Sequence, residues 1–246
     1  MKFFRRLYLR HQVTPYVILF LERDGSTFLT SLLISHPDIQ AIYERFAVLN
    51  QQGLNGSDQL AWARGLFTPS LFSRYAAVGF KTKLVDVQDL DGFTKLLQEK
   101  NCHIIHMQRR NSVKAVVSKI NARRLFEATG KWNLYTETDR LPAQDIDLAE
   151  FDQLLEEREQ ANRHLAQYID ELNLPTLKVV YEDLLIDHDA EIQRILEFLH
   201  VKPYPVQAKT LKNTRDNLRE AVANFDALRA RYSGTAYLSQ FDEVIT

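Results

Sequence analysis

The sequence of 246 residues contains a single cysteine, Cys102, and therefore cannot form a disulfide bond within the chain. One thiol also cannot build the cysteine cage of a structural zinc site. Because Cys102 stands beside an apolar run, we expect a small buried residue rather than a nucleophile. The scarcity of cysteine fits a protein of a reducing compartment.

An excess of charge of one sign is missing as well. Lysine and arginine total 31, aspartate and glutamate total 32, and the formal net charge is −1. A protein that binds nucleic acid usually presents a broad basic surface, so this balance argues against a nucleic-acid partner. Any bound anion must be held by a local cluster of basic groups.

Long apolar runs are also lacking. The basic N-terminal residues 1–12 precede an apolar run at 16–21 that is too short for a membrane span or for the core of a signal peptide. We therefore expect a cytoplasmic protein without a targeting segment. Contact of the basic start with a membrane surface is the less favoured alternative, because four basic side chains are commonly just solvated.

The residues that are present predict an α/β fold. Hydrophobic residues make up 45% of the chain and charged residues 26%, which is ordinary for a globular domain with a buried sheet. Short apolar runs predict buried strands, and the segments between them have apolar residues at the spacing of three and four that is typical of helices. The predicted strands are 16–21, 76–80, 103–107 and 177–181, and the predicted helices are 27–35, 87–98, 112–124, 148–172 and 189–199. This alternation predicts a single domain, residues 1–246, with a central parallel sheet flanked by helices.

The most informative motif is YVILFLERDGST at residues 16–27, where an apolar strand leads through a glycine-containing turn into a helix. At such a junction, free backbone N–H groups and the positive end of the helix dipole converge on a position that suits a phosphate group. Arg23 adds a full charge. The motif is not a Walker loop, because it has only Gly25 and no lysine before Ser26 or Thr27.

A second motif is HIIHMQRRNSVKAVVS at residues 103–118. An apolar run ends at Arg110, Asn111 and Ser112 are typical of a helix N-terminus, and Ser118 follows eight residues after Arg110. Taken together, the two motifs resemble the sulfotransferase family. Its members bind 3'-phosphoadenosine 5'-phosphosulfate (PAPS) with a strand-loop-helix for the 5'-phosphosulfate and with an arginine and a serine at this spacing for the 3'-phosphate.

Further segments carry the same resemblance along most of the chain. Residues 23–27 stand where carbohydrate and tyrosylprotein sulfotransferases usually have R-S-G-[ST]-[ST], with Asp24 as the departure. The triplet at 36–38, His-Pro-Asp, is followed six residues later by Glu44. VVYEDL at 179–184 is similar to a strand end common in the family, and LREAVANFDAL at 218–228 is similar to the tail of many bacterial members.

The resemblance implies a P-loop-like fold and a set of residues that bind the nucleotide. The loop residues Arg23, Asp24, Gly25, Ser26 and Thr27 would surround the 5'-phosphosulfate, although we expect the acidic side chain of Asp24 to point away, where it would hold Arg23 or cap the helix. The 3'-phosphate would be bound by Arg110 and Ser118. A loop over the 3'-phosphate and adenine is expected at Lys212, Asn213 and Thr214, for which a solvated basic turn is an equal alternative.

The resemblance also implies the catalytic groups. Sulfotransferases of phenols and steroids use a histidine in a K-T-H-L segment, but the similar segment here has Lys83 at that position, and a lysine is a poor base near neutral pH. Glu44 stands at the spacing of the catalytic glutamate of tyrosylprotein and carbohydrate sulfotransferases and is the preferred general base. The alternative is a surface carboxylate paired with Arg45 or Arg23. Lys81 would neutralise charge on the leaving phosphate, with Arg23 as the other catalytic cation.

We thus expect a sulfotransferase that moves a sulfuryl group from PAPS to a hydroxyl acceptor, a sugar, glycolipid or other metabolite alcohol, and leaves PAP. No metal is expected. Segments 50–75 and 129–147, the latter with Trp132 and Tyr135, lack a strong pattern and are expected to determine acceptor specificity. The alternatives are an ATP-dependent phosphotransferase, disfavoured by the missing Walker lysine, and a nucleotide-binding module that no longer catalyses. The oligomeric state is open.

Overall fold

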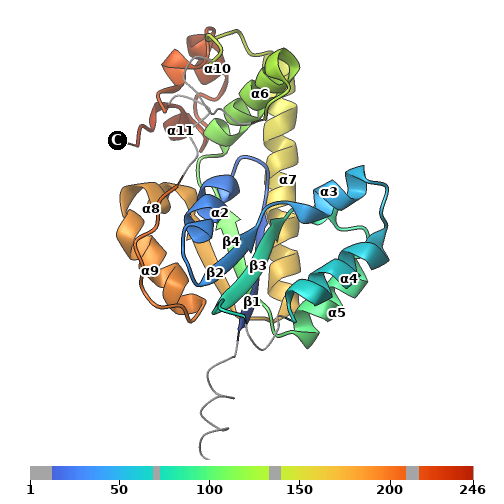
Figure 1. The fold of residues 1–246 in the computed structure, drawn as a ribbon. Coiled ribbons are helices and arrows are strands. Elements are labelled where there is room, and N and C mark those ends of the chain that lie inside the picture. Colours follow the sequence, from blue (N-terminus) through green and yellow to red (C-terminus); the bar gives the residue numbers. More distant parts are fainter. Residues whose placement is uncertain (1–12, 69–72, 133–139, 209–215, 246) are drawn as a thin grey trace, which may run out of the picture.

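The computed structural model describes residues 13–68, 73–132, 140–208 and 216–245. Within them, five parallel strands form one sheet in the order β2-β3-β1-β4-β5 (Figure 1). The strands are β1 (Thr14–Phe20), β2 (Ile39–Ile42), β3 (Ala77–Thr82), β4 (His103–Gln108) and β5 (Thr176–Val180). The prediction of an α/β fold with a central parallel sheet flanked by helices is confirmed. That residues 1–246 form one domain stays a prediction.

The helices of the described residues follow the strands in alternation and cover both faces of the sheet (Figure 1). They are α2 (Ser26–Ile34), α3 (Arg45–Gln51), α4 (Gly56–Leu66), α5 (Leu90–Glu99), α6 (Ser112–Thr129), α7 (Leu148–Leu172), α8 (Tyr181–Ile186), α9 (His188–Phe198), α10 (Phe225–Arg231) and α11 (Leu238–Asp242), with short 3₁₀ turns η1 (Leu84–Asp86) and η3 (Leu218–Glu220). Within the same ranges, no helix combines the length and the apolar character needed to cross a membrane.

The central strand β1 explains the two-layered core. Successive side chains of a strand point to opposite faces. Tyr16, Ile18 and Phe20 accordingly pack with α2, α8 and α9, whereas Val17 and Leu19 pack with α3, α4, α5 and the C-terminal half of α7. Because both faces of a parallel sheet are covered by helices, β1 reads in the sequence as an unbroken apolar run rather than as an alternating one.

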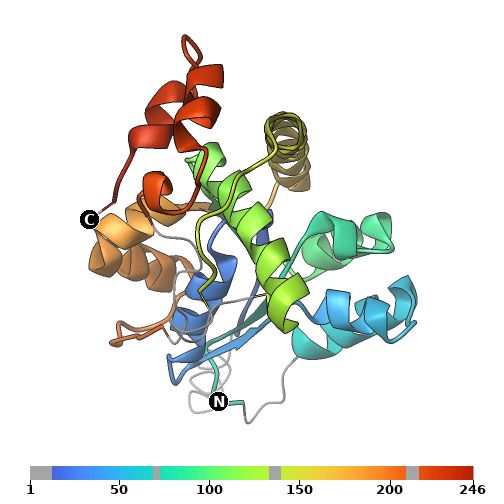
Figure 2. The same ribbon diagram turned by 90° about the horizontal axis from the view of Figure 1, so that it is seen from above.

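A third apolar cluster lies beyond the carboxyl edge of the sheet. It joins α6 and the N-terminal half of α7 to α10 and α11, with Phe151 and Phe241 among its buried aromatic residues. Figure 2 views the molecule from this edge and shows α6 lying across it. The long helix α7 reaches both the sheet and this cluster, and its bounds agree with the predicted 148–172.

The sequence pattern did not predict six of the described elements, β2, α3, α4, α8, α10 and α11, nor the two 3₁₀ turns. Strand β2 was not predicted because it has only 4 residues, of which only Ile39 is buried. Helices α3 and α4 lie in or beside the segment 50–75, which lacks a strong sequence pattern. Helix α4 does carry a start signal, a capping box in which Asn55 and Asp58 each bond the other's backbone N–H, and this signal went unrecognised.

Candidate active site

Charged side chains gather at the carboxyl edge of the sheet. Arg23 follows β1, Glu44 follows β2, Lys81 lies near the end of β3, and Arg109 follows β4. The carboxyl ends of parallel strands meet at one edge, and ligands of open α/β sheets bind there. Four strands that are separate in the sequence therefore supply one cluster of charged groups.

The loop after β1 turns sharply by means of two residues in the left-handed backbone region. Arg23 has φ 69° and Gly25 has φ 85°, and Gly25 is the N-cap of α2. No side chain caps this helix, so the N–H groups of its first turn remain open to another acceptor. The loop thus ends in an uncapped helix N-terminus, which suits an anion.

Both the left-handed backbone at position 25 and the close approach of Tyr181 require glycine there. A Cβ placed on Gly25 would lie 2.2 Å from Cδ2 of Tyr181, whereas a Cβ on Gly53, which has φ 73°, would meet nothing. We expect Gly53→Ala to lower the free energy of unfolding by the left-handed backbone cost of about 1–2 kcal/mol. Gly25→Ala should cost about 1–3 kcal/mol more, because the ring of Tyr181 must move. Urea denaturation of both variants measures the difference, and equal losses would refute the contact.

Asp24 points away from this loop into the protein. Its side chain is 1% exposed. The carboxylate accepts hydrogen bonds from Nη2 of Arg158 on α7 at 2.5 Å and from the backbone N–H of Leu21 at 2.9 Å. The partner is therefore Arg158, not Arg23, and Asp24 does not cap α2. Asp24 was expected among the residues that bind the cofactor. Its contacts do not support that role and instead fix the loop to α7.

Lys81 does not itself line the main cavity but contacts three residues that do, Ser26, Thr27 and Glu44. It is 2% exposed, and its Nζ donates hydrogen bonds to Oγ1 of Thr27 at 2.7 Å and to Oγ of Ser26 at 3.2 Å. The ammonium also lies 3.4 Å from Oε1 of Glu44. Burial lowers the pKa of Lys81 from 10.5 to about 8, although Glu44 acts in the opposite direction. A cation that loses its proton easily is thereby held against the first turn of α2.

Glu44 lies beside Lys81 but is still reached by solvent, with 37% of its side chain exposed. It is the N-cap residue of α3, yet its carboxylate makes no capping hydrogen bond and is not used by the helix. Its ion-pair partner is Lys81, rather than the Arg45 or Arg23 of the surface-carboxylate alternative. The carboxylate therefore lies both beside Lys81 and at the wall of the main cavity.

Arg23 and Ser118 are brought together although 95 residues separate them, because Nε of Arg23 donates to Oγ of Ser118 at 3.0 Å. The pKa of Arg23 is lowered to about 10, first by burial and then by the nearby charge of Arg109. Arg23, Gly25, Ser26, Thr27 and Ser118 all line one cavity. The first motif and the serine of the second motif thus share a site.

Arg110 stands apart from this group. Its exposed guanidinium donates to Oδ1 of Asp183 at 2.5 Å, and Arg110 is not among the residues that line the cavity. Its neighbour Arg109 does line the cavity, has a side chain 8% exposed, and donates to the carbonyl oxygen of Arg23 at 3.3 Å. The sequence reading passed over Arg109, although its position directly after β4 was a signal that could have identified it.

The segment 179–184, at the end of β5 and the start of α8, supports this arrangement. Glu182 is 1% exposed and accepts hydrogen bonds from the backbone N–H groups of Arg110 and Asn111. It also lies 3.8 Å from Nε of Arg109. One buried carboxylate therefore holds the turn that precedes α6 and neutralises the arginine that faces the cavity.

The cavity has a volume of about 510 Å³, within the usual range for small-molecule sites. Glu44, Gln51, Lys83 and Trp132 also line it, so both segments expected to determine acceptor specificity contribute a residue. Lys212, Asn213, Thr214 and Tyr135 lie outside the described residues. Among the residues that are described, no three His, Cys, Asp or Glu side chains are grouped in a way that could hold a metal ion.

Fold and site together define a class of protein: an α/β protein of the P-loop-like type, with a strand-loop-helix junction and a cation cluster at the carboxyl edge of its sheet. The chain belongs to the sulfotransferase family, because the family model described as "Sulfotransferase domain" matches residues 14–232. The resemblance stated from the sequence is thereby confirmed.

The chain is also similar to individual proteins. Nodulation protein H of Rhizobium tropici is 24% identical over 243 residues, and the match covers 93% of each chain. The crystal structure of a sulfotransferase from Alicyclobacillus acidocaldarius has a TM-score of 0.50 at 16% identity and covers 95% of this chain and 97% of its own. Mouse sulfotransferase SULT7A1 complexed with PAP has a TM-score of 0.45 at 12% identity, over 79% of this chain and 62% of the mouse chain.

Proposed function

We propose that the protein transfers the sulfuryl group of PAPS to the hydroxyl group of an alcohol, such as a sugar, a glycolipid or another metabolite. The observation that carries the proposal is the contact of Lys81 with Ser26 and Thr27 on one side and with Glu44 on the other. This contact joins a cation at an uncapped helix N-terminus to a partly exposed carboxylate. Such a pair supplies a cation for the charge on the leaving phosphate and a base for the acceptor proton.

The donor substrate would be held by the groups that line the cavity at the loop after β1. The N–H groups of the first turn of α2 and the guanidinium of Arg23 suit the 5'-phosphosulfate. Lys81 does not line the cavity, but it donates to Ser26 and Thr27 and adds positive charge next to them. Ser118 with Arg110 is proposed for the 3'-phosphate, and this requires the guanidinium of Arg110 to exchange Asp183 for the ligand. Arg109 already faces the cavity and adds positive charge there.

The transfer itself would be a single in-line displacement. The acceptor oxygen forms a bond to sulfur, the bond between sulfur and the 5'-phosphate oxygen breaks, and the acceptor proton passes to the carboxylate of Glu44. Negative charge develops on the departing phosphate of PAP, where Lys81 and Arg23 stabilise it. The protein's main contribution is the positioning of charged groups around the transferred sulfuryl group.

A thermal shift assay with PAP, ATP and AMP tests donor binding. PAP at ~100 times its Kd should stabilise the chain by about 2.7 kcal/mol, which raises Tm by roughly 5 to 10 °C for a protein of this size. We expect a shift that is specific for PAP and is lost in Arg110→Ala. If the shift is instead lost only in Arg109→Ala, the neighbouring arginine binds the 3'-phosphate.

The same assay separates the alternatives. An equal shift with ATP would favour a phosphotransferase, and no shift with any nucleotide would refute donor binding. PAP binding without a gain of sulfuryl mass on any alcohol of an acceptor screen would favour a nucleotide-binding module that no longer catalyses. Location in the cytoplasm is part of the proposal.

A further inference from the structure

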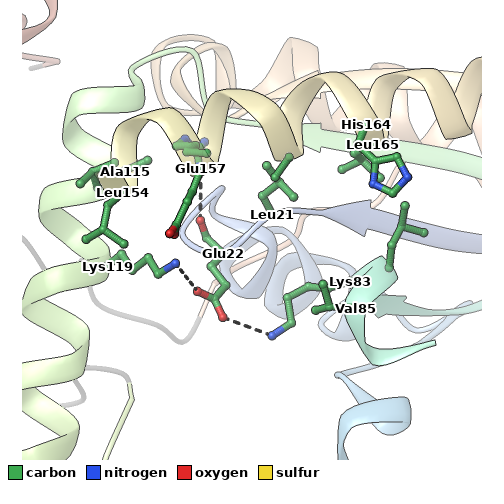
Figure 3. Close-up of a pocket in the computed structure, with 14 residues that line it drawn as sticks. Leu21, Glu22, Lys83, Val85, Ala115, Lys119, Leu154, Glu157, His164 and Leu165 are labelled. Carbon is green, nitrogen blue, oxygen red and sulfur yellow. Dashed lines mark hydrogen bonds and ion pairs between the residues drawn. The ribbon is translucent and has the colours of Figure 1, made fainter. Parts of the chain in front are cut away.

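A second cavity, of about 310 Å³, lies beside the proposed donor site (Figure 3). Its wall comes from the loop after β1, from η1, and from the facing sides of α6 and α7. The apolar wall residues are Leu21, Leu84, Val85, Ala115, Val116, Leu154, Ala161 and Leu165. The sequence reading assigned no function to any of them.

The two cavities are neighbours that share part of their walls. Glu22, Lys83, Lys119 and Leu154 line both. Figure 3 shows the carboxylate of Glu22 between the two lysines, which lie 3.4 Å (Lys83) and 3.6 Å (Lys119) from its oxygens. The ion pairs of Glu22 with Lys83 and Lys119 therefore lie between the apolar cavity and the site of Glu44 and Lys81.

Most of the charged groups that line the second cavity have partners within the protein, and Glu157 accepts a hydrogen bond from Gln153. Glu22 pairs with the two lysines, and Arg158 donates to Asp24 and to the carbonyl oxygen of Glu22. At the same time Val85 is 85% exposed, which is unusual for a large apolar side chain that lines a cavity. Such a wall favours an apolar occupant over a charged one.

We propose that this cavity binds the apolar part of an amphiphilic acceptor, whose hydroxyl-bearing head lies in the main cavity beside Glu44. The proposal rests on the proposed function and narrows its acceptor class to alcohols that carry a hydrocarbon chain or ring. The paired charges of Glu22, Lys83 and Lys119 offer hydrogen bonds to the polar head at the boundary. A water molecule occupies ~30 Å³ in the liquid, so the cavity of about 310 Å³ accommodates about ten groups of that size.

Binding of methyl, butyl, hexyl and octyl β-D-glucoside tests the proposal. Isothermal titration with PAP present, below the micelle concentration of each glucoside, gives the Kd of each probe. Each methylene group that enters the cavity should tighten binding by up to ~4-fold, the affinity change that corresponds to burial of one such group. Octyl glucoside that binds no tighter than methyl glucoside would overturn the proposal.

Two variants locate the binding. Ala161 is half-buried on α7 and lines the cavity, so Ala161→Phe should fill it and remove the gain from the longer chains. Ala149→Phe is the matched control, because Ala149 is exposed in the first turn of the same helix and does not line the cavity. Val85→Asp, at an exposed position, should also weaken octyl glucoside binding. If longer alkyl chains still bind more tightly in both Ala161→Phe and Val85→Asp, the alkyl chain binds outside this cavity.

The tests of donor binding and of acceptor binding can fail independently of each other. A PAP-specific thermal shift without dependence on chain length overturns the cavity proposal and leaves the proposed function intact. Tight binding of octyl glucoside without a PAP shift refutes the proposed function and, with it, the acceptor role of the cavity. Both variants should retain the PAP shift of the native chain, which confirms that they fold.

Discussion

Replacement of Glu44 by glutamine is expected to lower kcat by ~10²- to 10⁴-fold, the usual contribution of a general base. The amide keeps the size and the hydrogen-bonding shape of the side chain but cannot take up the acceptor proton. Affinity for PAP should change little, because Glu44 is not among the groups proposed to bind the nucleotide. Steady-state kinetics, with PAP titrated in the thermal shift assay, separate the two effects.

A matched control uses another exposed carboxylate in an ion pair. Glu99 is paired with Arg64 on the surface and does not line the main cavity. Glu99→Gln should leave kcat unchanged. If Glu44→Gln behaves like Glu99→Gln, then Glu44 is only the partner of Lys81 and another group must accept the proton.

The pH profile gives an independent reading of the same variant. Glu44 raises the pKa of Lys81, through its charge and its hydrogen bond, against the larger effect of burial. Its replacement should therefore lower the pKa of Lys81 further, and the residual activity should decline at a lower pH than in the native chain. A change in kcat without this shift would mean that the two side chains do not interact in solution.

The parts of the site that the sequence predicts are those encoded by local spacing. Gly25, Ser26 and Thr27 lie within seven residues of the end of β1, so an apolar run, a glycine and a helical pattern were enough to place them. Glu44 was inferred from its distance to Arg23 in related sequences, and the structure places it against Lys81. Local order in the chain carries this information because the carboxyl ends of parallel strands must meet.

The contacts that the sequence could not predict join residues far apart in the chain. Asp24 has its partner on α7, 134 residues away, and nothing in the sequence near either residue indicates the pair. The choice between Arg109 and Arg110 at the cavity depends on Glu182, which fixes the turn from 72 residues further on. Such pairings depend on how helices pack on the sheet, and burial rather than sequence spacing decides them.

Lys81→Met should be the most informative change at the donor site. Methionine has a similar length but no charge, so the stabilisation of the leaving phosphate is lost and kcat should fall by ~10²- to 10³-fold, as for removal of one preorganised donor. The fold should not suffer. Replacing a buried charge by an apolar side chain of similar volume is often neutral or stabilising, and the remaining Glu44 is reached by water.

The native pH dependence follows from the same side chain. Because the pKa of Lys81 lies at about 8 instead of 10.5, its ammonium is present below that pH and is lost as the pH rises through it. The kcat/KM of the native chain, which reports the free protein, should therefore decline above pH ~8. A bound anionic donor favours the ammonium, so the decline in kcat should occur at a higher pH than the decline in kcat/KM. Lys81→Met should lack this alkaline decline, and a decline that persists in Lys81→Met would assign it to a different group.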